Sequence, residues 1–472
     1  MTNADDLRGQ LTADLQRLCT EHEVPGASVA VLVDGEVVEA TFGVVNVRTG
    51  VPVTPDTLFM IQSITKILTA TLAMQLVDAG LVELDDPIHH HLPQFHTADR
   101  EVSSRVTVRH LLTHTGGFAG DLWAATTSGP DALQRFVEDL VSDAPQYSEP
   151  GEQFSYCNAG FGVLGRLVEV KRGVTYEEAV RRYLAEPLAV DELAFSADQA
   201  LAFRTAIGHV HPKPDSALRP LRHWAVMPPS NPAAGNQLAM SARGLLAVAR
   251  MHLNDGRSPD GSAVLSEAST RLMRERQVDH PAALGAPSSH GLGWWLQRDR
   301  LAEHGGGATG VAAMLRTAPQ HGLAAVVLTN AESGGAIVDD LLEPVFAERA
   351  DLPQAPGLST PDAGTRVADP HPYLGHFDSR QNRLEVTQLD DGRFWLTTVP
   401  QGESLEFAAL AGTTATSQAY ELRPVNADTF ANSFVVIGDT GRATYPVEFL
   451  GRDDHDCARF LFFGGRAVPR SD

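Results

Sequence analysis

Residues 59–82 read FMIQSITKILTATLAMQLVDAGLV, and this stretch decides how the rest of the chain is interpreted. Its long apolar run predicts a helix that ends near Gly80, with Ser63 and Lys66 at its beginning. Residues three apart share one face of a helix, so the Ser63 hydroxyl and the Lys66 amine can touch. A cation in the first turn opposes the helix dipole, and such local misfits often mark function. The alternative is a capping serine beside a solvated lysine, and S-x-x-K alone does not decide between the two.

The amino-acid composition limits the kinds of molecule that this protein can bind. The chain has 472 residues, with 37 Lys plus Arg against 59 Asp plus Glu, which gives a net charge of −22. This acidic balance would repel phosphate backbones and anionic lipid surfaces, so we expect no nucleic-acid or membrane partner. The length predicts two or three folding units with a sizeable core.

The cysteines and the N-terminus indicate a compartment. Cys19, Cys157 and Cys457 are few, odd in number and far apart, which argues against a disulfide framework. The first residues are acidic and amphipathic, unlike a signal peptide, and no run of 18 apolar residues occurs. We therefore expect a cytoplasmic protein without a membrane span.

The first 350 residues alternate between strand and helix patterns. Residues 5–22 predict an amphipathic helix, and a hairpin is expected around Asp34-Gly35. Residues 86–240 are expected to be mostly helix and loop. Short apolar runs then predict antiparallel strands in HGLGWWLQ, TGVAAMLRTAP and GLAAVVLTNAE, followed by a helix over 335–349. This order predicts an α/β (α+β) unit in which an antiparallel sheet, built from both ends of the segment, is flanked by helices and interrupted by an α-rich insertion.

A change of pattern follows residue 350. Residues 351–370 are proline-rich and predict a stiff linker. Residues 371–472 contain at least six short runs of strand character separated by turn residues. About 100 residues of this kind predict a small antiparallel β-barrel, lipocalin-like in form, which closes its own edges. We therefore expect units at 1–350 and 371–472, joined by the linker.

Two further motifs accompany SITK. The segment GEQFSYCNAGFGVLG contains Tyr156 and Asn158 as Y-x-N within the helical insertion. The segment LAEHGGGATGVAAML contains His304, followed by three glycines, at the start of an expected strand. Taken singly, Y-x-N is typical of a satisfied buried pair, and H-G-G-G of a flexible loop beside a surface histidine.

In this order and at these separations, the three motifs resemble the serine penicillin-recognising family of class C β-lactamases, D,D-carboxypeptidases, D-aminopeptidases and related esterases. The phrases PGASVAVLVDGEVV, TPDTLFMIQSITK and VTVRHLLTHTGGF are also similar to that family. The resemblance covers about residues 5–350. It implies a β-lactamase/transpeptidase-like catalytic fold and a serine hydrolase that needs no metal or cofactor.

The resemblance also implies roles for the motif residues. Ser63 is the expected nucleophile, because an alcohol must be activated by an adjacent base. Either Lys66 or Tyr156 can be that base, and two coupled groups need not titrate separately. Asn158 is expected to hold Lys66 and the substrate. The N–H groups of Ser63 and Gly307 are the implied oxyanion hole.

Glycines beside His304 have a physical reason. Substrate must lie along the edge of this strand, and side chains at Gly305, Gly306 and Gly307 would block its approach. His304 itself stands where classical β-lactamases carry a lysine. Because histidine is mostly neutral near pH 7, recognition of free carboxylates becomes doubtful, and the H-x-G form looks like that of esterases and D-aminopeptidases.

Three further features of the sequence have structural interpretations or no assigned role. Gly160, Gly162 and Gly165 match G-x-G-x-x-G, but they follow Y-x-N between helical segments and indicate close helix packing rather than a dinucleotide site. His114, in LLTHTGG, is expected to be a buried, hydrogen-bonded group without a catalytic role. Cys157 is assigned no role.

The sequence leaves three functions open. The leading one is a hydrolase that acts on a small ester, amide or short-peptide substrate through an acyl-Ser63 intermediate. The second is an acyltransferase or a peptide-cyclising thioesterase of the penicillin-binding-protein type. The third is a sensor of β-lactams or peptidoglycan fragments that is acylated without turnover. The oligomeric state is not indicated.

Overall fold

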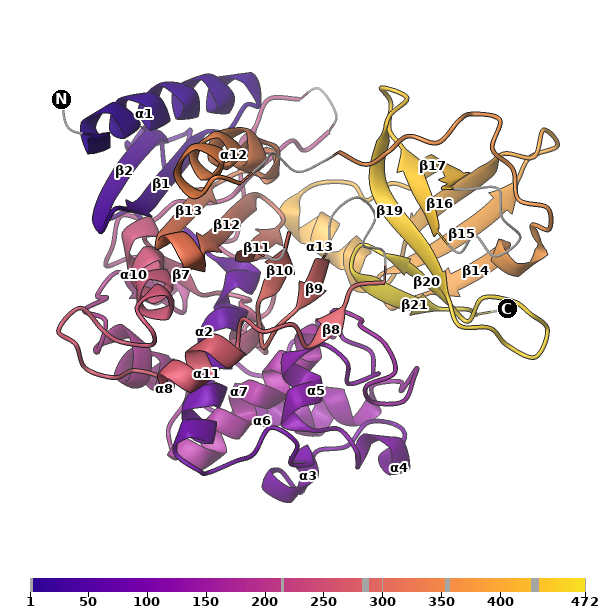
Figure 1. The fold of residues 1–472 in the computed structure, drawn as a ribbon, viewed down its shortest axis with the longest axis horizontal. Coiled ribbons are helices and arrows are strands. Elements are labelled where there is room, and N and C mark those ends of the chain that lie inside the picture. The colour runs from indigo at the N-terminus through magenta and orange to yellow at the C-terminus, as the bar shows by residue number, and fades with distance from the viewer. Residues whose placement is uncertain are drawn as a thin grey trace.

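A computed structural model describes residues 3–213, 216–281, 288–298, 300–352, 357–425 and 433–471. Two eight-stranded antiparallel sheets organise it, one in the first 350 residues and one in the last 100 (Figure 1). Residues 353–356 of the predicted linker lie outside the described residues. The unit boundaries at 350 and 371 stay a prediction.

The first sheet combines strands from both ends of its segment, as expected. Its order is β2 (Glu36–Gly43), β1 (Gly26–Val33), β13 (Leu323–Thr329), β12 (Val311–Ala318), β11 (Leu301–Ala308), β10 (Trp295–Gln297), β9 (Ser288–His290) and β8 (Val278–Asp279). The hairpin at Asp34-Gly35 is present, and both residues have positive φ. HGLGWWLQ was expected to be one strand, but a turn at 291–294 divides it into β9 and β10.

Helices cover both faces of this sheet. Alternate residues of β1 point to opposite sides, and α1 (Asn3–Glu21) and α12 (Ile337–Ala350) pack together on one side through Leu7, Leu11 and Leu341. The α-rich part lies on the other side (Figure 1). It contains α2 (Thr65–Asp78), α3 (Ile88–His91), α4 (Arg100–Ser103), α5 (Val108–Leu112), α6 (Ala132–Arg135), α7 (Asn158–Arg172), α8 (Tyr176–Val180), α9 (Ala197–Ala200), α10 (Ala242–Leu253) and α11 (Glu267–Leu272).

Short strands complete the α-rich part. β3 (Phe59–Met60), β7 (Ala239–Met240) and β4 (Leu193–Ala194) form a three-stranded sheet, and β5 (His209–Val210) pairs with β6 (Arg219–Pro220). The β3–β7 pairing brings the chain just before Ser63 beside the segment that follows Gly235. It therefore fixes the entry to α2.

The glycines of the G-x-G-x-x-G match lie inside α7. A Cβ at Gly165 would lie 2.4 Å from Ala233 Cβ, and one at Gly162 would lie 2.6 Å from the Phe136 ring. Such approaches are too close for a side chain, so these glycines allow neighbouring chain to pack against the helix. This agrees with the packing interpretation of the motif.

The C-terminal sheet is a barrel, as the strand pattern predicts. Its order is β14 (Gly375–Asp378), β15 (Asn382–Gln388), β16 (Phe394–Pro400), β17 (Gln418–Pro424), β18 (Ser433–Ile437), β19 (Ala443–Leu450), β20 (Phe460–Phe463) and β21 (Arg466–Pro469). A bridge between Phe377 and Arg470 joins the first strand to the end of the last. The helix α13 (Glu403–Ala411), between β16 and β17, was not predicted.

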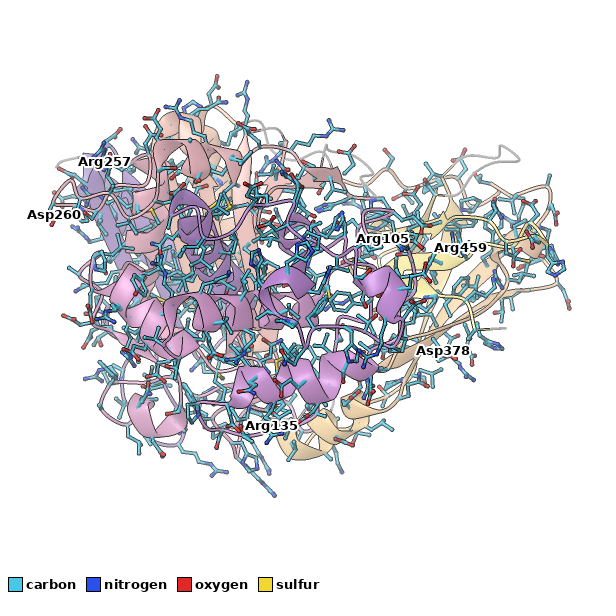
Figure 2. All side chains as sticks on the ribbon, turned by 90° about the horizontal axis from the view of Figure 1, so that it is seen from below. Arg105, Arg135, Arg257, Asp260, Asp378 and Arg459 are labelled. Carbon is cyan, nitrogen blue, oxygen red and sulfur yellow. The ribbon has the colours of Figure 1, made fainter. Side chains whose placement is uncertain are left out.

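The barrel contacts the α-rich part directly. Arg459 Nη1 donates to Glu152 Oε1 at 2.8 Å, and Figure 2 shows Arg459 where the two parts meet. The Tyr156 N–H donates to the Gly465 carbonyl at 2.9 Å. The last hairpin of the barrel is therefore in backbone contact with a predicted site residue.

Two searches of the described residues bear on the class of protein. None of their helices has the length and apolar character needed to cross a membrane. Among the same residues, no group of three or more His, Cys, Asp or Glu side chains is arranged to hold a metal ion.

Candidate functional site

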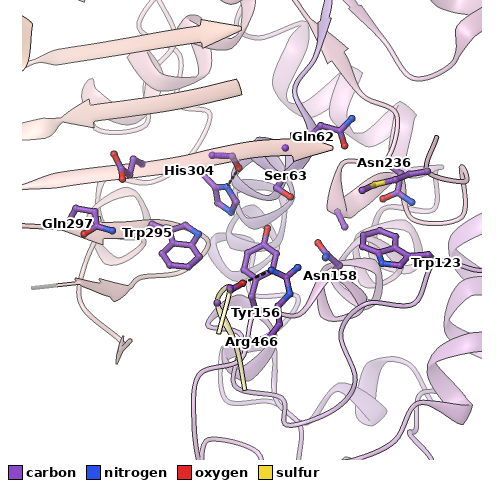
Figure 3. A pocket seen from close by; sticks show the side chains of 17 residues that line it. Gln62, Ser63, Trp123, Tyr156, Asn158, Asn236, Trp295, Gln297, His304 and Arg466 are labelled. Atoms are coloured by element: carbon purple, nitrogen blue, oxygen red, sulfur yellow. Dashed lines mark hydrogen bonds between the residues drawn. The ribbon is translucent and has the colours of Figure 1, made fainter. Parts of the chain in front are cut away.

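Six of the predicted site residues, Ser63, Tyr156, Asn158, His304, Gly305 and Gly307, line a cavity of about 360 Å³ between α2, the edge of β11 and the last hairpin of the barrel. Figure 3 shows the Tyr156 hydroxyl pointing toward Ser63 and His304, with Arg466 beside the Tyr156 ring. The lining residues are Gln62, Ser63, Trp123, Tyr156, Asn158, Met227, Ala234, Asn236, Trp295, Gln297, Glu303, His304, Gly305, Gly307, Gly464, Gly465 and Arg466. Segments more than 400 residues apart in sequence therefore share one pocket.

Ser63 and Lys66 are in contact. Lys66 Nζ lies 3.1 Å from Ser63 Oγ and donates to the Ala234 carbonyl at 2.9 Å. The Lys66 side chain is fully buried, which excludes a solvated surface lysine. Burial lowers its pKa well below the usual value of 10.5, the positive charge of Arg466 lowers it further, and Asp121 opposes the shift. The neutral amine is thereby favoured.

The backbone at Ser63 is held in an uncommon conformation. Ser63 lies in a 3₁₀ turn (Gln62–Ile64) just before α2, and Gln62 has φ of 49°. A Cβ at Gly235 would lie 1.9 Å from the Gln62 carbonyl oxygen, and Gly235 itself has φ of 105°. Only glycine therefore fits beside this turn.

Tyr156 enters the pocket just before α7. Its ring centroid lies 4.9 Å from Lys66 Nζ and 4.9 Å from Arg466 Cζ. Burial raises the pKa of Tyr156 above its usual value, while the Ser63 hydroxyl and Arg466 oppose the rise. The phenol is thus favoured over the phenolate that Tyr156 would need to be as the base.

Cys157, to which the sequence analysis assigned no role, has a structural one. Its Sγ accepts a hydrogen bond from the Gly160 N–H at 3.3 Å, which caps the first turn of α7. Burial raises the pKa of the Cys157 thiol to about 12. A thiol in this state is a weak nucleophile.

Asn158 has a different partner from the one expected. Its Nδ2 donates to Asp121 Oδ1 at 2.6 Å. Within the described part of the chain, the hydrogen bonds of Lys66 Nζ are with Ser63 and Ala234, so the expected bond between Asn158 and Lys66 is not formed. The physical reason is that Lys66 Nζ donates to the Ala234 carbonyl instead, while the Asn158 amide is held by the Asp121 carboxylate, a charge-assisted acceptor.

His304 is buried and neutral. It is the fourth residue of β11 rather than the first. Its Nδ1–H donates to the Gly305 carbonyl at 2.7 Å, which leaves Nε2 as an unprotonated acceptor. Burial, with a smaller contribution from Lys66, lowers the pKa of His304 to about 3. The expected neutral imidazole agrees with this environment.

The three glycines after His304 do not share one role. Beyond Glu303, β11 has no pairing with β10, so the edge of β11 is open to the pocket. Gly305 and Gly307 line the pocket along this edge. Gly306 is not among the residues that line the pocket, and a Cβ there would lie 2.2 Å from the Ile61 carbonyl oxygen. Gly306 therefore allows close packing of β11 against the Ser63 turn, and its expected role in substrate binding stays a prediction.

Arg466 is the residue that sequence reasoning missed. Its Nε lies 3.0 Å from Asp121 Oδ2 and its Nη1 donates to the Gly464 carbonyl at 2.9 Å. The only local signal was the FGGR turn, in which two glycines with positive φ form the end of a hairpin. No spacing rule connects that turn with a helix 300 residues earlier.

His114 is buried, as expected. Its Nδ1 accepts from the Cys157 N–H at 2.9 Å, and its ring centroid lies 4.4 Å from that of Tyr156. Nε2 has no hydrogen-bond partner among the described residues. His114 thus supports the segment that carries Tyr156 without lining the pocket.

Comparison with known proteins gives the same assignment as the motifs. The β-lactamase family profile matches residues 10–345. Penicillin-binding protein 4 of Amycolatopsis lactamdurans is 38% identical over 368 residues, which are 76% of this chain and 95% of that protein. The crystal structure of SurE with D-Leu has a TM-score of 0.76 at 27% identity and covers 99% of this chain and 100% of that one. An octameric penicillin-binding protein homologue from Pyrococcus abyssi has a TM-score of 0.63 at 23% identity, covering 94% and 96% of the two chains, and shares the fold. The chain therefore belongs to the β-lactamase family of serine penicillin-recognising proteins.

Proposed function

We propose that this protein is a serine hydrolase that cleaves a small ester or amide through an acyl-Ser63 intermediate. The observation that carries the proposal is the contact between Ser63 Oγ and the fully buried Lys66 amine at 3.1 Å. A neutral amine whose N–H is occupied by the Ala234 carbonyl has its lone pair available for the Ser63 proton. Family membership supports the same chemistry.

Acylation would proceed by attack of Ser63 Oγ on the substrate carbonyl while Lys66 Nζ accepts the Oγ proton. The N–H groups of Ser63 and Gly307 would stabilise the developing oxyanion. A donor of this kind typically lowers the barrier by about 2.7–4 kcal/mol. The open edge of β11 leaves room for the substrate backbone beside these groups.

The leaving group would take its proton from the Tyr156 phenol. The opposite pKa shifts, lowered for Lys66 and raised for Tyr156, favour Lys66 as base and Tyr156 as acid. Asn158 and His304 would orient the substrate, through the amide and the free Nε2 lone pair. Water would then attack the acyl-enzyme, with the Tyr156 phenolate left by proton donation to the leaving group removing its proton, and the protonated Lys66 would return a proton to Ser63 Oγ as the acyl–oxygen bond breaks.

The test is covalent labelling. Wild-type protein, incubated with activated esters, D-amino acid amides and β-lactams, should gain the mass of the acyl group, and Ser63→Ala should not. Labelling retained in a folded Ser63→Ala protein would refute the proposal. A single stoichiometric burst of product without turnover would support the sensor instead.

Acyl transfer is the second candidate. It is supported by the Arg466 side of the pocket, which leads toward the barrel and offers room beside Ser63 for an acceptor. The SurE structure was determined with D-Leu, an amino acid that carries an amine. Added amines should then accelerate acyl release and yield aminolysis products, whereas water as the sole acceptor would eliminate transfer.

The proposal also includes the cellular compartment and the binding partner of the protein. Few and separated cysteines favour a cytoplasmic location. The partner would be a small acyl or short-peptide substrate.

A further inference from the structure

A second cavity, of about 440 Å³, lies at the mouth of the C-terminal barrel. It shares four lining residues with the catalytic pocket, namely Trp123, Met227, Gly464 and Arg466. The two spaces are therefore contiguous. Each is within the range of roughly 300–1,000 Å³ that is usual for small-molecule sites, and barrel mouths are frequent ligand sites.

The wall of this second cavity is made by both parts of the chain. Trp123 and Phe407 meet edge to face with ring centroids 6.2 Å apart, so α13 closes the cavity over the α-rich part. The remaining residues that line it come from the barrel: Ser379, Gln381, Asn382, Leu384, Thr398, Ser404, Gln418, Tyr420, Phe463 and Val468. The unpredicted helix α13 thus has a defined position over the barrel mouth.

The lining alternates between apolar groups and neutral hydrogen-bonding groups. Amide side chains (Gln381, Asn382 and Gln418) and hydroxyls (Ser379, Thr398 and Ser404) are interspersed with Leu384, Phe407 and Phe463. Gln381 Nε2 already donates to the Asp121 carbonyl, and Gln418 Oε1 accepts from the Tyr420 hydroxyl. A fatty acyl chain offers no partner for the hydrogen-bonding capacity that remains on these side chains, and covering it with an alkyl group would be unfavourable. A peptide offers both carbonyl and N–H groups to them.

The charge of the lining is balanced. Its ionisable pair is Asp121 with Arg466, and these two are ion-paired with each other at 3.0 Å. A charged side chain on the ligand would therefore enter this space without a compensating charge. The cavity suits a neutral segment.

We propose that the barrel mouth is a subsite for the distal part of the acyl substrate, and that this part is an uncharged peptide segment of several residues. The inference rests on the proposed function for the position of the reacting carbonyl at Ser63. It deepens that function by naming the substrate class: peptidyl esters, thioesters or amides with neutral side chains, in preference to alkanoyl esters of equal length.

The first experiment is a length series. N-acetylated peptidyl p-nitrophenyl esters of one to four neutral residues are compared with alkanoyl p-nitrophenyl esters of matched length. For wild-type protein, kcat/KM should rise with peptide length, mainly through KM, and the alkanoyl series should stay flat. Replacing the distal residue by Glu or Lys should cancel the gain.

A pair of variants on α13 tests the location. Ser404 lines the cavity, whereas its neighbour Leu405 is 50% exposed and does not. Ser404→Trp should fill the cavity and lower kcat/KM for the four-residue ester about tenfold, the loss expected for one well-packed group. The kcat/KM for the one-residue ester should stay unchanged. Leu405→Trp should leave both esters unchanged.

Failure of this inference is distinguishable from failure of the proposed function. Equal kcat/KM across the peptide series, or equal losses for short and long esters in Ser404→Trp, would overturn the subsite while Ser63 still becomes acylated. If no ester acylates Ser63, calorimetry with Ser63→Ala and an N-acetyl tetrapeptide amide tests the cavity alone. Binding that is lost in Ser63→Ala/Ser404→Trp and kept in Ser63→Ala/Leu405→Trp would support it, and no binding in any variant would overturn it.

Discussion

Arg466 Nε lies 3.0 Å from Asp121 Oδ2, so the last hairpin of the barrel is ion-paired to the α-rich part beside the catalytic pocket. The same Asp121 accepts a hydrogen bond from Asn158 at 2.6 Å. The two charges act on Lys66 in opposite directions, because Arg466 lowers the pKa of Lys66 and Asp121 raises it. The barrel thus contributes to the electrostatics of the nucleophile, although it contains none of the three motifs.

This opposition gives a prediction for the pH dependence of activity. The acid limb of the kcat/KM profile for a neutral ester reports the pKa of the base in the free enzyme. Arg466→Met should move that limb to higher pH, and Asp121→Asn should move it to lower pH. Arg459→Met, which removes the ion pair with Glu152 outside the pocket, is the control and should leave it in place. Shifts of the same sign in both pocket variants would contradict the assignment of Lys66 as base.

The same pair predicts a coupling in stability. Arg466→Met leaves the Asp121 carboxylate without its cation, and because the Arg466 side chain is 38% exposed, solvent limits the expected loss to about 1–2 kcal/mol. Asp121→Asn in the same protein should restore part of it. Urea unfolding of the two single variants and the double variant measures the coupling, and strictly additive losses would show that the pair is not coupled.

Lys66 gives a prediction for stability against pH. Its pKa is well below 10.5 in the folded protein, so between that lowered pKa and 10.5 the unfolded chain binds more protons at this residue. The stability of the wild type therefore rises with pH in this window relative to Lys66→Met. The stability advantage of Lys66→Met should shrink by about 1.4 kcal/mol per pH unit as the pH approaches 10.5. Urea unfolding at pH 7, 8 and 9 checks this, and a constant difference would place the pKa of Lys66 near its ordinary value.

Lys66 and Tyr156 should act as one unit. Lys66→Ala, Tyr156→Phe and the double variant are each expected to lose a similar amount of kcat/KM, because removing one member of a proton-transfer unit already disables it. Steady-state kinetics on one activated ester measures all three. A double variant whose loss equals the product of the single losses would separate the two residues.

His304 should set selectivity for charge. A neutral imidazole favours uncharged esters, and His304→Lys places a permanent cation beside the substrate. A hydrogen bond to a charged group contributes about 1.5–3 kcal/mol, so kcat/KM for a carboxylate-bearing ester relative to a neutral one should rise roughly tenfold to a hundredfold. An unchanged ratio would discard carboxylate recognition at this position, whatever happens to the absolute rates.

Gly306 and Gly307 form a matched pair for the geometry of the nucleophile. A Cβ at Gly306 would lie 2.2 Å from the Ile61 carbonyl oxygen, whereas one at Gly307 meets nothing within 4 Å. Gly306→Ala must therefore displace β11 or the Ser63 turn, and a displacement of about 1 Å can cost on the order of a hundredfold in rate. Thermal unfolding should show a lower midpoint for Gly306→Ala and an unchanged one for Gly307→Ala. Equal midpoints would mean that the turn accommodates the methyl group.

The sequence by itself determined much of this protein. The 3.6-residue and two-residue periods predicted α1, the β1–β2 hairpin and the barrel strands, because burial of an apolar face is encoded locally. The spacing of Ser63 and Lys66 predicted their contact, since one helical turn fixes the distance between such neighbours. Three ordered motifs then predicted the family.

Only the tertiary structure decided how the site is completed. Arg466 reaches Tyr156 and Asp121 because the barrel packs against the α-rich part, and no local period records that contact. Asn158 bonds to Asp121 and not to Lys66 because the fold places a carboxylate from a loop 37 residues earlier beside the Asn158 amide. The protonation states of Lys66, Tyr156 and His304 also depend on the fold, because desolvation is a property of everything packed around a group and not of its neighbours in sequence.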